Sequence, residues 1–261
     1  MVSDEILRQA QMKMFDILLA IDDVCKKHNV KYWLGYGTLL GAVRHKGFIP
    51  WDDDCDICMM RSDFEKFEKV AHELPEHIFL QTPETDPGYH KKMVKVRMKN
   101  TKLVEFDESE NEKYHQGIFV DVFVWDYHPV MHKVIFDSIS FINQLRIKRK
   151  KYPKGSLRRS AIQLALVLPY WGYSAVMKLI IFVSRSYRDN ESLPLVGMKA
   201  ALRDRFLFEK DTIFPLSKCV FEGKEFPVPH NSGKFLGTIY GDYLTLPPVE
   251  ERHFHARQIE I

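Results

Sequence analysis

Four aspartates lie within six residues of the chain, directly before a short apolar run, in the order Trp51-Asp52-Asp53-Asp54-Cys55-Asp56-Ile57-Cys58-Met59-Met60. If residues 54–60 form a strand, side chains alternate between its faces, so Asp54 and Asp56 point the same way with α-carbons roughly 7 Å apart. Carboxylates at that separation can share a divalent cation, and Mg²⁺ held by a few carboxylates and substrate phosphates is typical of phosphoryl-transfer sites. The spacing predicts a site for Mg²⁺ or Mn²⁺, with a solvated acidic turn as the alternative.

The residues beside this pair have different expected roles. Asp52 lies on the same face as the pair and is expected among the substrate-binding residues, whereas Asp53 points away and suits a turn or a cap. Trp51 could enclose a quaternary ammonium together with Trp125 and Tyr127 through cation–π attraction, although aromatic residues beside strands more often belong to the core.

A glycine-rich turn precedes the acidic motif. Residues 32–47 read as a short apolar strand, a turn containing Gly35 and Gly37, and a helix over 38–45. Glycines let the backbone approach a ligand closely, Thr38 can cap the helix, and a helix N-terminus favours an anion. The pattern predicts a phosphate-binding turn, and a tight structural connection is the alternative.

Three basic residues end the predicted helix, namely Arg44, His45 and Lys46. They follow the glycine turn by about two helical turns, where they could reach a second phosphate. The alternative is a basic C-terminal cap, which interacts favourably with the helix dipole.

A third acidic residue is expected beside the first two. Residues 117–126 read as a strand buried on both faces, with Asp121 at its centre and Asp126 at its end. A buried carboxylate requires a partner, a metal or a shifted pKa, so Asp121 is expected on a strand adjacent to Asp54 and Asp56. A structural aspartate bonded to backbone amides is the alternative, and Asp126 suits a turn or a helix cap.

The run from Gly37 to Asp54, followed by Asp56, resembles the LicD family. Two further stretches fit this resemblance, the 117–126 strand and the tail Tyr240-Gly241-Asp242-Tyr243 with Leu246-Pro247-Pro248. The resemblance covers residues from about 5 to 130 and from about 215 to 255. It implies a nucleotidyltransferase-type fold and the transfer of a phosphoalcohol, since relatives transfer phosphocholine or ribitol phosphate.

The resemblance also implies roles for individual residues. The glycine turn, Gly37 and Thr38, would hold phosphate, and Asp54, Asp56 and Asp121 would bind the metal. Related eukaryotic proteins often carry a cysteine zinc module, which this chain lacks, so no zinc is expected.

These roles suggest a mechanism in which Mg²⁺ bridges the diphosphate of a CDP-alcohol such as CDP-choline. A sugar hydroxyl then attacks the distal phosphorus, and CMP leaves. Asp121 would orient or deprotonate the acceptor, and Arg44 and Lys46 would stabilise the departing phosphate. The tail residues Tyr240, Asp242, Arg252 and His253 could contact the nucleotide or the alcohol, with a surface turn as the alternative. Choline, ethanolamine, ribitol and glycerol remain open as the alcohol.

The expected enzyme is therefore a phosphotransferase, a cholinephosphotransferase that acts on a glycan or lipid-linked glycan of lipopolysaccharide, teichoic acid or capsule. A nucleotidyltransferase that releases pyrophosphate would use the same aspartates, and a non-catalytic membrane-docked scaffold would need none of them. Product analysis separates the first two possibilities.

Composition favours a cytoplasmic catalytic protein. The 261 residues are 45% hydrophobic, enough for a full core, and four cysteines give no disulfide framework. The sequence opens with a polar amphipathic helix, so no secretory signal is expected.

The formal charge of +3 conceals a basic segment. Residues 146–159 carry eight basic residues and no acid, and removing them leaves a net charge of −5. The mostly apolar residues 161–183 follow, interrupted by Pro169, Gly172 and Lys178. The segment 146–183 suits peripheral contact with the inner face of the cell membrane, a buried helical hairpin being the alternative, and no nucleic acid partner is expected.

We predict an α+β fold, a nucleotidyltransferase-like mixed sheet with flanking helices and a helical insertion. The expected parts are a catalytic core over 1–130, an insertion over 131–212 and a C-terminal segment over 213–261 that completes the site. Helices are expected at 4–28, 38–45, 62–74, between about 130 and 210, and at 231–240. Strands are expected at 31–34, 54–60, 77–81, 93–98, 102–106, 118–124 and around 219–228. The capping box Ser62-Asp63-Phe64-Glu65 is expected to start the helix after the acidic strand.

Overall fold

The computed structural model describes residues 3–90, 93–130, 133, 156–158, 190–198, 206–252 and 254–261. The chain divides into two units, Met1–Trp125 with Asp211–Ile261, and Asp126–Lys210. Most of the predicted insertion, including nearly all of the basic and apolar segment 146–183, lies outside the described residues.

A mixed sheet forms the centre of the first unit. Its strands follow the order β1-β2-β6-β4-β3, with bounds Trp33–Leu34, Asp56–Met60, Phe119–His128, Val94–Met98 and Ile78–Gln81. β2 and β6 are parallel, and the other pairs in this order are antiparallel. The α+β class with a mixed sheet is therefore confirmed.

The pairing of β2 with β6 places two aspartates side by side. The register aligns Asp56 with Asp121, which confirms that the third carboxylate lies on the strand next to the acidic motif. On its other side, Asp121 faces Lys95 of β4. β6 has apolar neighbours on both sides because it is a central strand of the sheet.

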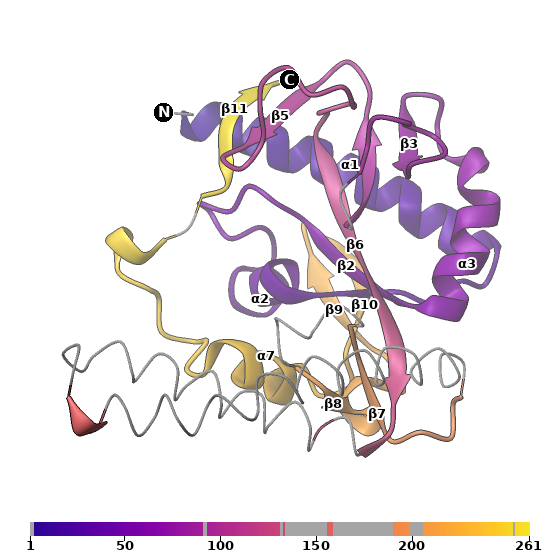
Figure 1. The fold of residues 1–261 in the computed structure, drawn as a ribbon, viewed down its shortest axis with the longest axis vertical. Helices are drawn as coiled ribbons and strands as arrows, with labels where there is room; N and C mark the ends of the chain where they lie inside the picture. Colours follow the sequence, from indigo (N-terminus) through magenta and orange to yellow (C-terminus); the bar gives the residue numbers. More distant parts are fainter. Residues whose placement is uncertain are drawn as a thin grey trace. The chain divides into compact units, whose positions relative to one another are not determined.

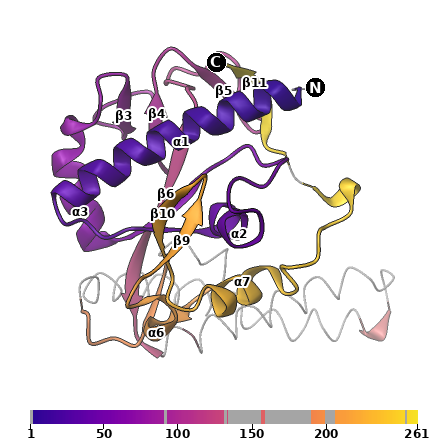
Figure 2. The ribbon, with the colours of Figure 1, turned by 180° about the vertical axis from the view of Figure 1, so that it is seen from behind.

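Helix α1 (Asp4–Lys27) crosses one face of this sheet (Figures 1 and 2). It begins where Ser3 accepts a hydrogen bond from the amide of Ile6 at 3.3 Å, as an N-cap should. Apolar residues at helical spacing, including Met14, Ile17 and Ile21, are fully buried. The predicted helix over 4–28 is thus confirmed to within one residue.

Two helix starts differ from the prediction. Helix α2 (Tyr36–His45) begins two residues early with Gly35 as N-cap, so Thr38 lies inside the helix and does not cap it. Helix α3 (Arg61–Val70) begins with Met60 as N-cap and no side-chain capping bond, so the capping-box prediction at Ser62 is wrong. The buried strand β2 runs directly into α3, and the backbone of its last residue already has the extended conformation that an N-cap needs.

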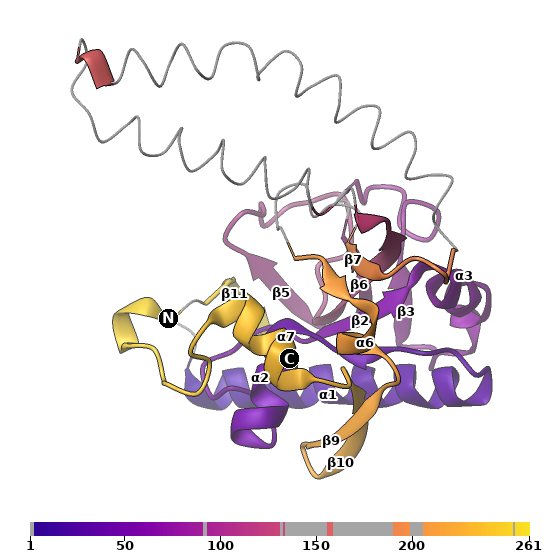
Figure 3. The same cartoon turned by 90° about the horizontal axis from the view of Figure 1, so that it is seen from below.

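The C-terminal part of the first unit contains a hairpin, a helix and a strand. β9 (Ser217–Phe221) and β10 (Lys224–Val228) form the hairpin (Figure 3), and α7 (Ser232–Tyr240) lies beside α2. The last strand, β11 (Ala256–Glu260), pairs with β5 (Lys102–Glu105). The sequence prediction missed β11, because its apolar residues are too few to show alternation.

Short elements complete the described residues. They are the 3₁₀ turns η1 (Ala71–Glu73) and η3 (Val249–Glu251), helix α6 (Lys210–Ile213), and strands β7 (Leu195–Met198) and β8 (Phe208–Glu209). β7 pairs with β6 and β8, so the prediction of helices throughout 130–210 is wrong at these two strands. Among the described residues, no helix has both the length and the apolar character required to span a bilayer.

Candidate active site

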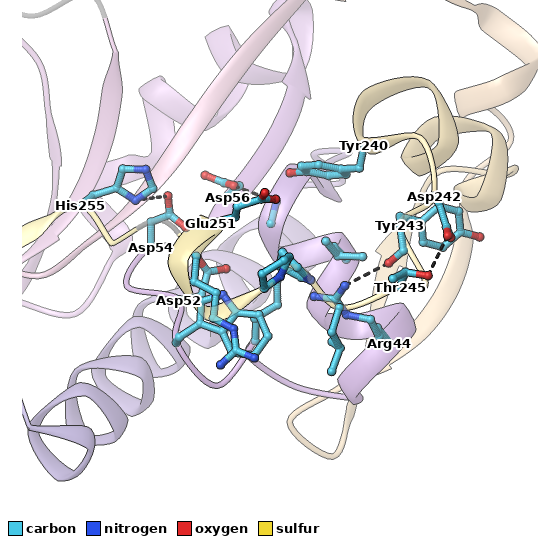
Figure 4. A pocket seen from close by; sticks show the side chains of 18 residues that line it. Arg44, Asp52, Asp54, Asp56, Tyr240, Asp242, Tyr243, Thr245, Glu251 and His255 are labelled. Carbon is cyan, nitrogen blue, oxygen red and sulfur yellow. Dashed lines mark hydrogen bonds and ion pairs between the residues drawn. The ribbon is translucent and has the colours of Figure 1, made fainter.

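A pocket of about 600 Å³ opens in the first unit between two segments far apart in the sequence. One segment contains α2 and the acidic motif, and the other runs from the end of α7 to the start of β11 (Figure 4). The lining residues are Gly37, Leu40, Arg44, Ile49, Trp51, Asp52, Asp54, Asp56, Tyr240, Asp242, Tyr243, Thr245, Leu246, Pro247, Pro248, Glu251, Arg252 and His255.

Three carboxylates converge on the first turn of α2. A β-carbon placed on Gly37 would lie 3.0 Å from Asp52 Oδ2, 3.6 Å from Asp56 Oδ2 and 3.7 Å from Asp54 Oδ1. The amide of Gly37 donates to Asp56 Oδ2 at 3.2 Å. The absence of a side chain at position 37 therefore leaves the space in which these oxygens meet.

The residues around this turn fix Asp56. Thr38 Oγ1 accepts a hydrogen bond from the Asp56 amide at 2.7 Å, and the Gly35 amide donates to the Asp56 carbonyl at 3.1 Å. A β-carbon on Gly35 would lie 2.6 Å from Cys58 Sγ. Gly35 and Thr38 are not among the pocket-lining residues, so they act here by packing and by positioning the strand.

Burial and mutual repulsion raise the pKa of all three carboxyl groups. Burial is the largest cause for each, and neighbouring aspartates add to it. The pKa of Asp54 rises to about 6, with His255 and Lys95 acting in the opposite direction. The cluster is therefore short of positive charge, as expected of residues that bind a cation.

We expect the metal-free protein to lose stability as pH rises from about 4 to about 7. Raised folded-state pKa values mean that the folded protein binds more protons than the unfolded chain, so the free energy of unfolding falls over this window. Urea denaturation with a chelator at several pH values measures the slope. Mg²⁺ should make the free energy of unfolding depend less steeply on pH. A free energy of unfolding that rises with pH over this window, without Mg²⁺, would contradict this account of the cluster.

Asp121 lies behind the pocket and contacts a buried lysine. Lys95 is 3% exposed, and its Nζ lies 3.0 Å from Asp121 Oδ1 and 3.4 Å from Glu105 Oε2. The ammonium also lies 3.2 Å from the centre of the Phe119 ring. Lys95 was not predicted, although the two basic residues Lys95 and Arg97 between the apolar residues of Val94–Met98 are an available signal.

The donor groups of this cluster suit Mg²⁺ or Mn²⁺, since they are hard carboxylate oxygens in a region of excess negative charge. As placed, no three His, Cys, Asp or Glu side chains of the described residues are already arranged to hold a metal ion. The carboxylates would therefore have to rotate toward a common centre. Metal binding by Asp54, Asp56 and Asp121 stays a prediction.

Across the pocket from Asp54 and His255 lie Arg44, Tyr240 and Tyr243, together with Asp242 and Thr245 (Figure 4). Arg44 donates through Nη1 to the Tyr243 carbonyl at 3.0 Å and through Nε to His45 Nε2 at 2.9 Å. His45 does not line the pocket, and burial followed by the charge of Arg44 lowers its pKa. Lys46 is exposed at the left-handed end of α2, with Nζ 3.5 Å from the Val43 carbonyl. Of the three basic residues, only Arg44 lines the pocket.

The aromatic residues separate into two groups. Trp125 is fully buried and packs on Trp33 and Phe235, so it belongs to the core, the alternative that the sequence favoured over an ammonium-binding box. Trp51 does line the pocket, where the Arg252 guanidinium lies 3.9 Å from its ring centre. Tyr127 is buried in the second unit.

The tail contributes residues that the sequence only partly indicated. Tyr240, Asp242 and Arg252 line the pocket, while His253 lies outside the described residues, so contact of these residues with the substrate stays a prediction. Asp242 Oδ2 accepts from Thr245 Oγ1 at 2.7 Å. Glu251 and His255 were missed. Gln11 was also missed; it is buried in α1 and its Nε2 donates to the carbonyls of Ile49 at 3.1 Å and Asp52 at 2.9 Å, fixing the loop before the carboxylates.

Comparison with known proteins identifies the family of the chain. Residues 29–158 match the family LicD/FKTN/FKRP, nucleotidyltransferase domain. The chain is 28% identical over 260 residues to the lipopolysaccharide cholinephosphotransferase LicD of Haemophilus influenzae, covering 97% of this chain and 96% of that one. It is also 43% identical over 47 residues to the human ribitol 5-phosphate transferase FKRP, covering 18% of this chain and 10% of that protein. The chain therefore belongs to the LicD family, whose nucleotidyltransferase domain it carries over residues 29–158.

Proposed function

We propose that this protein transfers a phosphoalcohol, phosphocholine from CDP-choline, to a hydroxyl of a cell-surface glycan or glycolipid precursor and releases CMP. The observation that carries the proposal is the convergence of Asp52, Asp54 and Asp56 on Gly37 inside the pocket. Similarity over nearly the whole length of a cholinephosphotransferase supports this type of reaction.

In the proposed reaction, a bond forms between the acceptor oxygen and the distal phosphorus of the donor. The bond between that phosphorus and the bridging oxygen breaks, and CMP leaves with the electron pair. Mg²⁺ held by Asp54 and Asp56 would supply neutralisation of the diphosphate charge when bound. Arg44, at the other side of the pocket, would bind a phosphate oxygen, since a guanidinium suits phosphate geometry.

The acceptor hydroxyl must lose its proton as the new bond forms. We assign Asp121 to orient that hydroxyl or receive the proton, because it adjoins Asp56 on the neighbouring strand. Its ion pair with Lys95 holds it in one orientation. Protein carboxylates positioned in this way commonly act as general bases.

We place the reaction at the inner face of the cell membrane, on a lipid-linked glycan of lipopolysaccharide, teichoic acid or capsule. The name of the full-length relative supports a lipopolysaccharide acceptor. Contact with the membrane through 146–183 rests on the basic composition of that segment.

Incubation with Mg²⁺, a glycan acceptor and one CDP-alcohol at a time tests the function. We expect CMP release with CDP-choline to exceed that with CDP-ethanolamine, CDP-ribitol or CDP-glycerol by about tenfold or more, since specific pocket contacts contribute on the order of 1–3 kcal/mol. Chromatography of the nucleotide products measures this. CTP and ATP serve as controls, and pyrophosphate release from either would indicate nucleotidyl transfer instead.

A further inference from the structure

The described residues of the C-terminal segment 241–255, which are 241–252, 254 and 255, form one wall of the pocket and are here called the strap. The strap supplies half of the 18 lining residues, namely Asp242, Tyr243, Thr245, Leu246, Pro247, Pro248, Glu251, Arg252 and His255. Its apolar side chains are largely exposed, with Leu244 at 64% and Val249 at 67%. Core packing therefore contributes little to the position of the strap, which depends on its attachments to the rest of the protein.

Three attachments join the strap to residues 44–53. Arg44 donates to the Tyr243 carbonyl at 3.0 Å, and Arg252 stacks on Trp51 at 3.9 Å. The third involves Asp53. Arg44, Trp51 and Asp53 all belong to residues 44–53, which run into the acidic motif. This segment therefore both holds the strap and positions the carboxylates of the pocket.

Asp53 makes the attachment with the most hydrogen bonds. It is 1% exposed, and its Oδ2 accepts from the amide of His255 at 2.8 Å and from the amide of Ala256. Its Oδ1 lies 3.2 Å from His255 Nδ1. A buried carboxylate is costly without such donors, so Asp53 and the end of the strap depend on each other.

The attachment lies where the strap becomes a strand. Ala256 is the first residue of β11 and pairs with Glu105 of β5. The same contact places His255 Nδ1 3.7 Å from Asp54 Oδ2 (Figure 4). Asp53 therefore sets the distance between the end of the strap and the carboxylates of the pocket.

We propose that Asp53 is a positioning residue that takes no part in metal binding. Instead, it holds the strap in place, so that the strap residues Arg252 and His255 lie against the bound CDP-alcohol donor. The proposal rests on the proposed function for its substrate, but the attachment itself does not. Loss of Asp53 should weaken donor binding more than it slows the chemical step, because the strap touches the donor and Asp53 does not.

The Asp53→Asn variant tests this proposal. Asparagine keeps the shape of the side chain but has no charge, so the bonds from the amides of His255 and Ala256 lose their charge assistance, which makes such bonds roughly twice as strong as neutral ones. We expect the KM for CDP-choline to rise about tenfold with kcat changed less than about threefold. Trypsin should also cut after Arg252, the one trypsin site within 241–255, about tenfold faster, because cleavage follows the population of the open segment.

Two control variants separate the effects. His255→Ala keeps both backbone bonds to Asp53, so its strap should resist trypsin as the unmodified protein does. Asp63→Asn removes another buried aspartate, on α3 and outside the pocket, and should leave both the KM and the cleavage rate unchanged. A collapse of kcat at normal KM in Asp53→Asn would assign Asp53 to the metal ligands and overturn the proposal.

Hydrogen exchange of the unmodified protein gives a measurement that depends on neither folding of a variant nor activity. The amides of His255 and Ala256 should exchange as slowly as those of the β5–β11 pair. Fast exchange at both would overturn the proposal, as would normal trypsin resistance of folded Asp53→Asn. If no CDP-alcohol is a substrate, hydrogen exchange and trypsin cleavage still test whether Asp53 holds the strap. Failure of the proposed function can therefore be distinguished from failure of the attachment.

Discussion

The Asp54→Asn variant is expected to lose activity and to gain stability. Asp54 is one of three carboxylates that meet at Gly37, and removing a preorganised charged group of this kind costs roughly 10²–10³ in kcat or more. Burial raises the pKa of Asp54 to about 6 from its usual 3.8. Above pH 6 the folded protein must hold an unfavourable charge that asparagine lacks, so metal-free Asp54→Asn should be more stable by on the order of 1–3 kcal/mol.

Steady-state CMP release and urea denaturation with a chelator measure the two effects. Mg²⁺ should raise the unfolding midpoint of the unmodified protein and leave that of the variant nearly unchanged, because ligand binding to the folded state is stabilising. The control is Asp16→Asn, on the exposed face of α1, which should change neither quantity. Full turnover by Asp54→Asn would exclude Asp54 from the site, and reduced stability would show that the cluster already has a compensating partner.

The Lys95→Met variant is expected to lose about 3–5 kcal/mol of unfolding free energy, because it leaves a buried carboxylate without its cation. Methionine fills a similar volume, so the loss reports the charge and not a cavity. The ammonium of Lys95 is nearly inaccessible and lies 3.0 Å from Asp121 Oδ1. Equilibrium urea denaturation gives the value.

An exposed ion pair of similar length provides the control. Lys218 lies 3.2 Å from Glu225 with both side chains mostly exposed, so Lys218→Met should cost less than about 1 kcal/mol. The double variant Lys95→Met/Asp121→Asn should recover part of the lost stability but no activity, because both charges are gone. Equal effects of Lys95→Met and Lys218→Met would refute a role for the buried pair.

Local patterns were sufficient for much of the fold. The 3.6-residue spacing of α1 fixed that helix to within one residue. The strands predicted at 93–98 and 118–124 correspond to β4 and to β6, which continues to His128. Helix starts were less predictable. Gly35 and Met60 act as N-caps without a side-chain bond. Glycine is common at N-caps, but the residue type of Met60 does not indicate that role.

The pocket itself depends on contacts that local patterns do not contain. Glu222, at the turn of the β9–β10 hairpin, accepts from the Phe48 amide at 3.0 Å and pairs with Arg8 at 2.7 Å. A β-carbon on Gly47 would lie 2.4 Å from Glu222 Oε1, so glycine is needed where the hairpin meets the loop before the acidic motif. These partners are more than 170 residues apart in the sequence.

The sequence by itself determined where the carboxylates lie: the alternation of a strand puts Asp54 and Asp56 on one side, and a buried Asp121 requires a neighbour as partner, a metal or a shifted pKa. Only the tertiary structure decided which neighbour that is, placing Lys95 on the adjacent strand β4. It also decided that Asp53, whose side chain points away from the pair, binds the strap 202 residues later. The reason is physical: periodicity specifies the face on which a side chain lies, whereas its partner depends on which distant segments pack together.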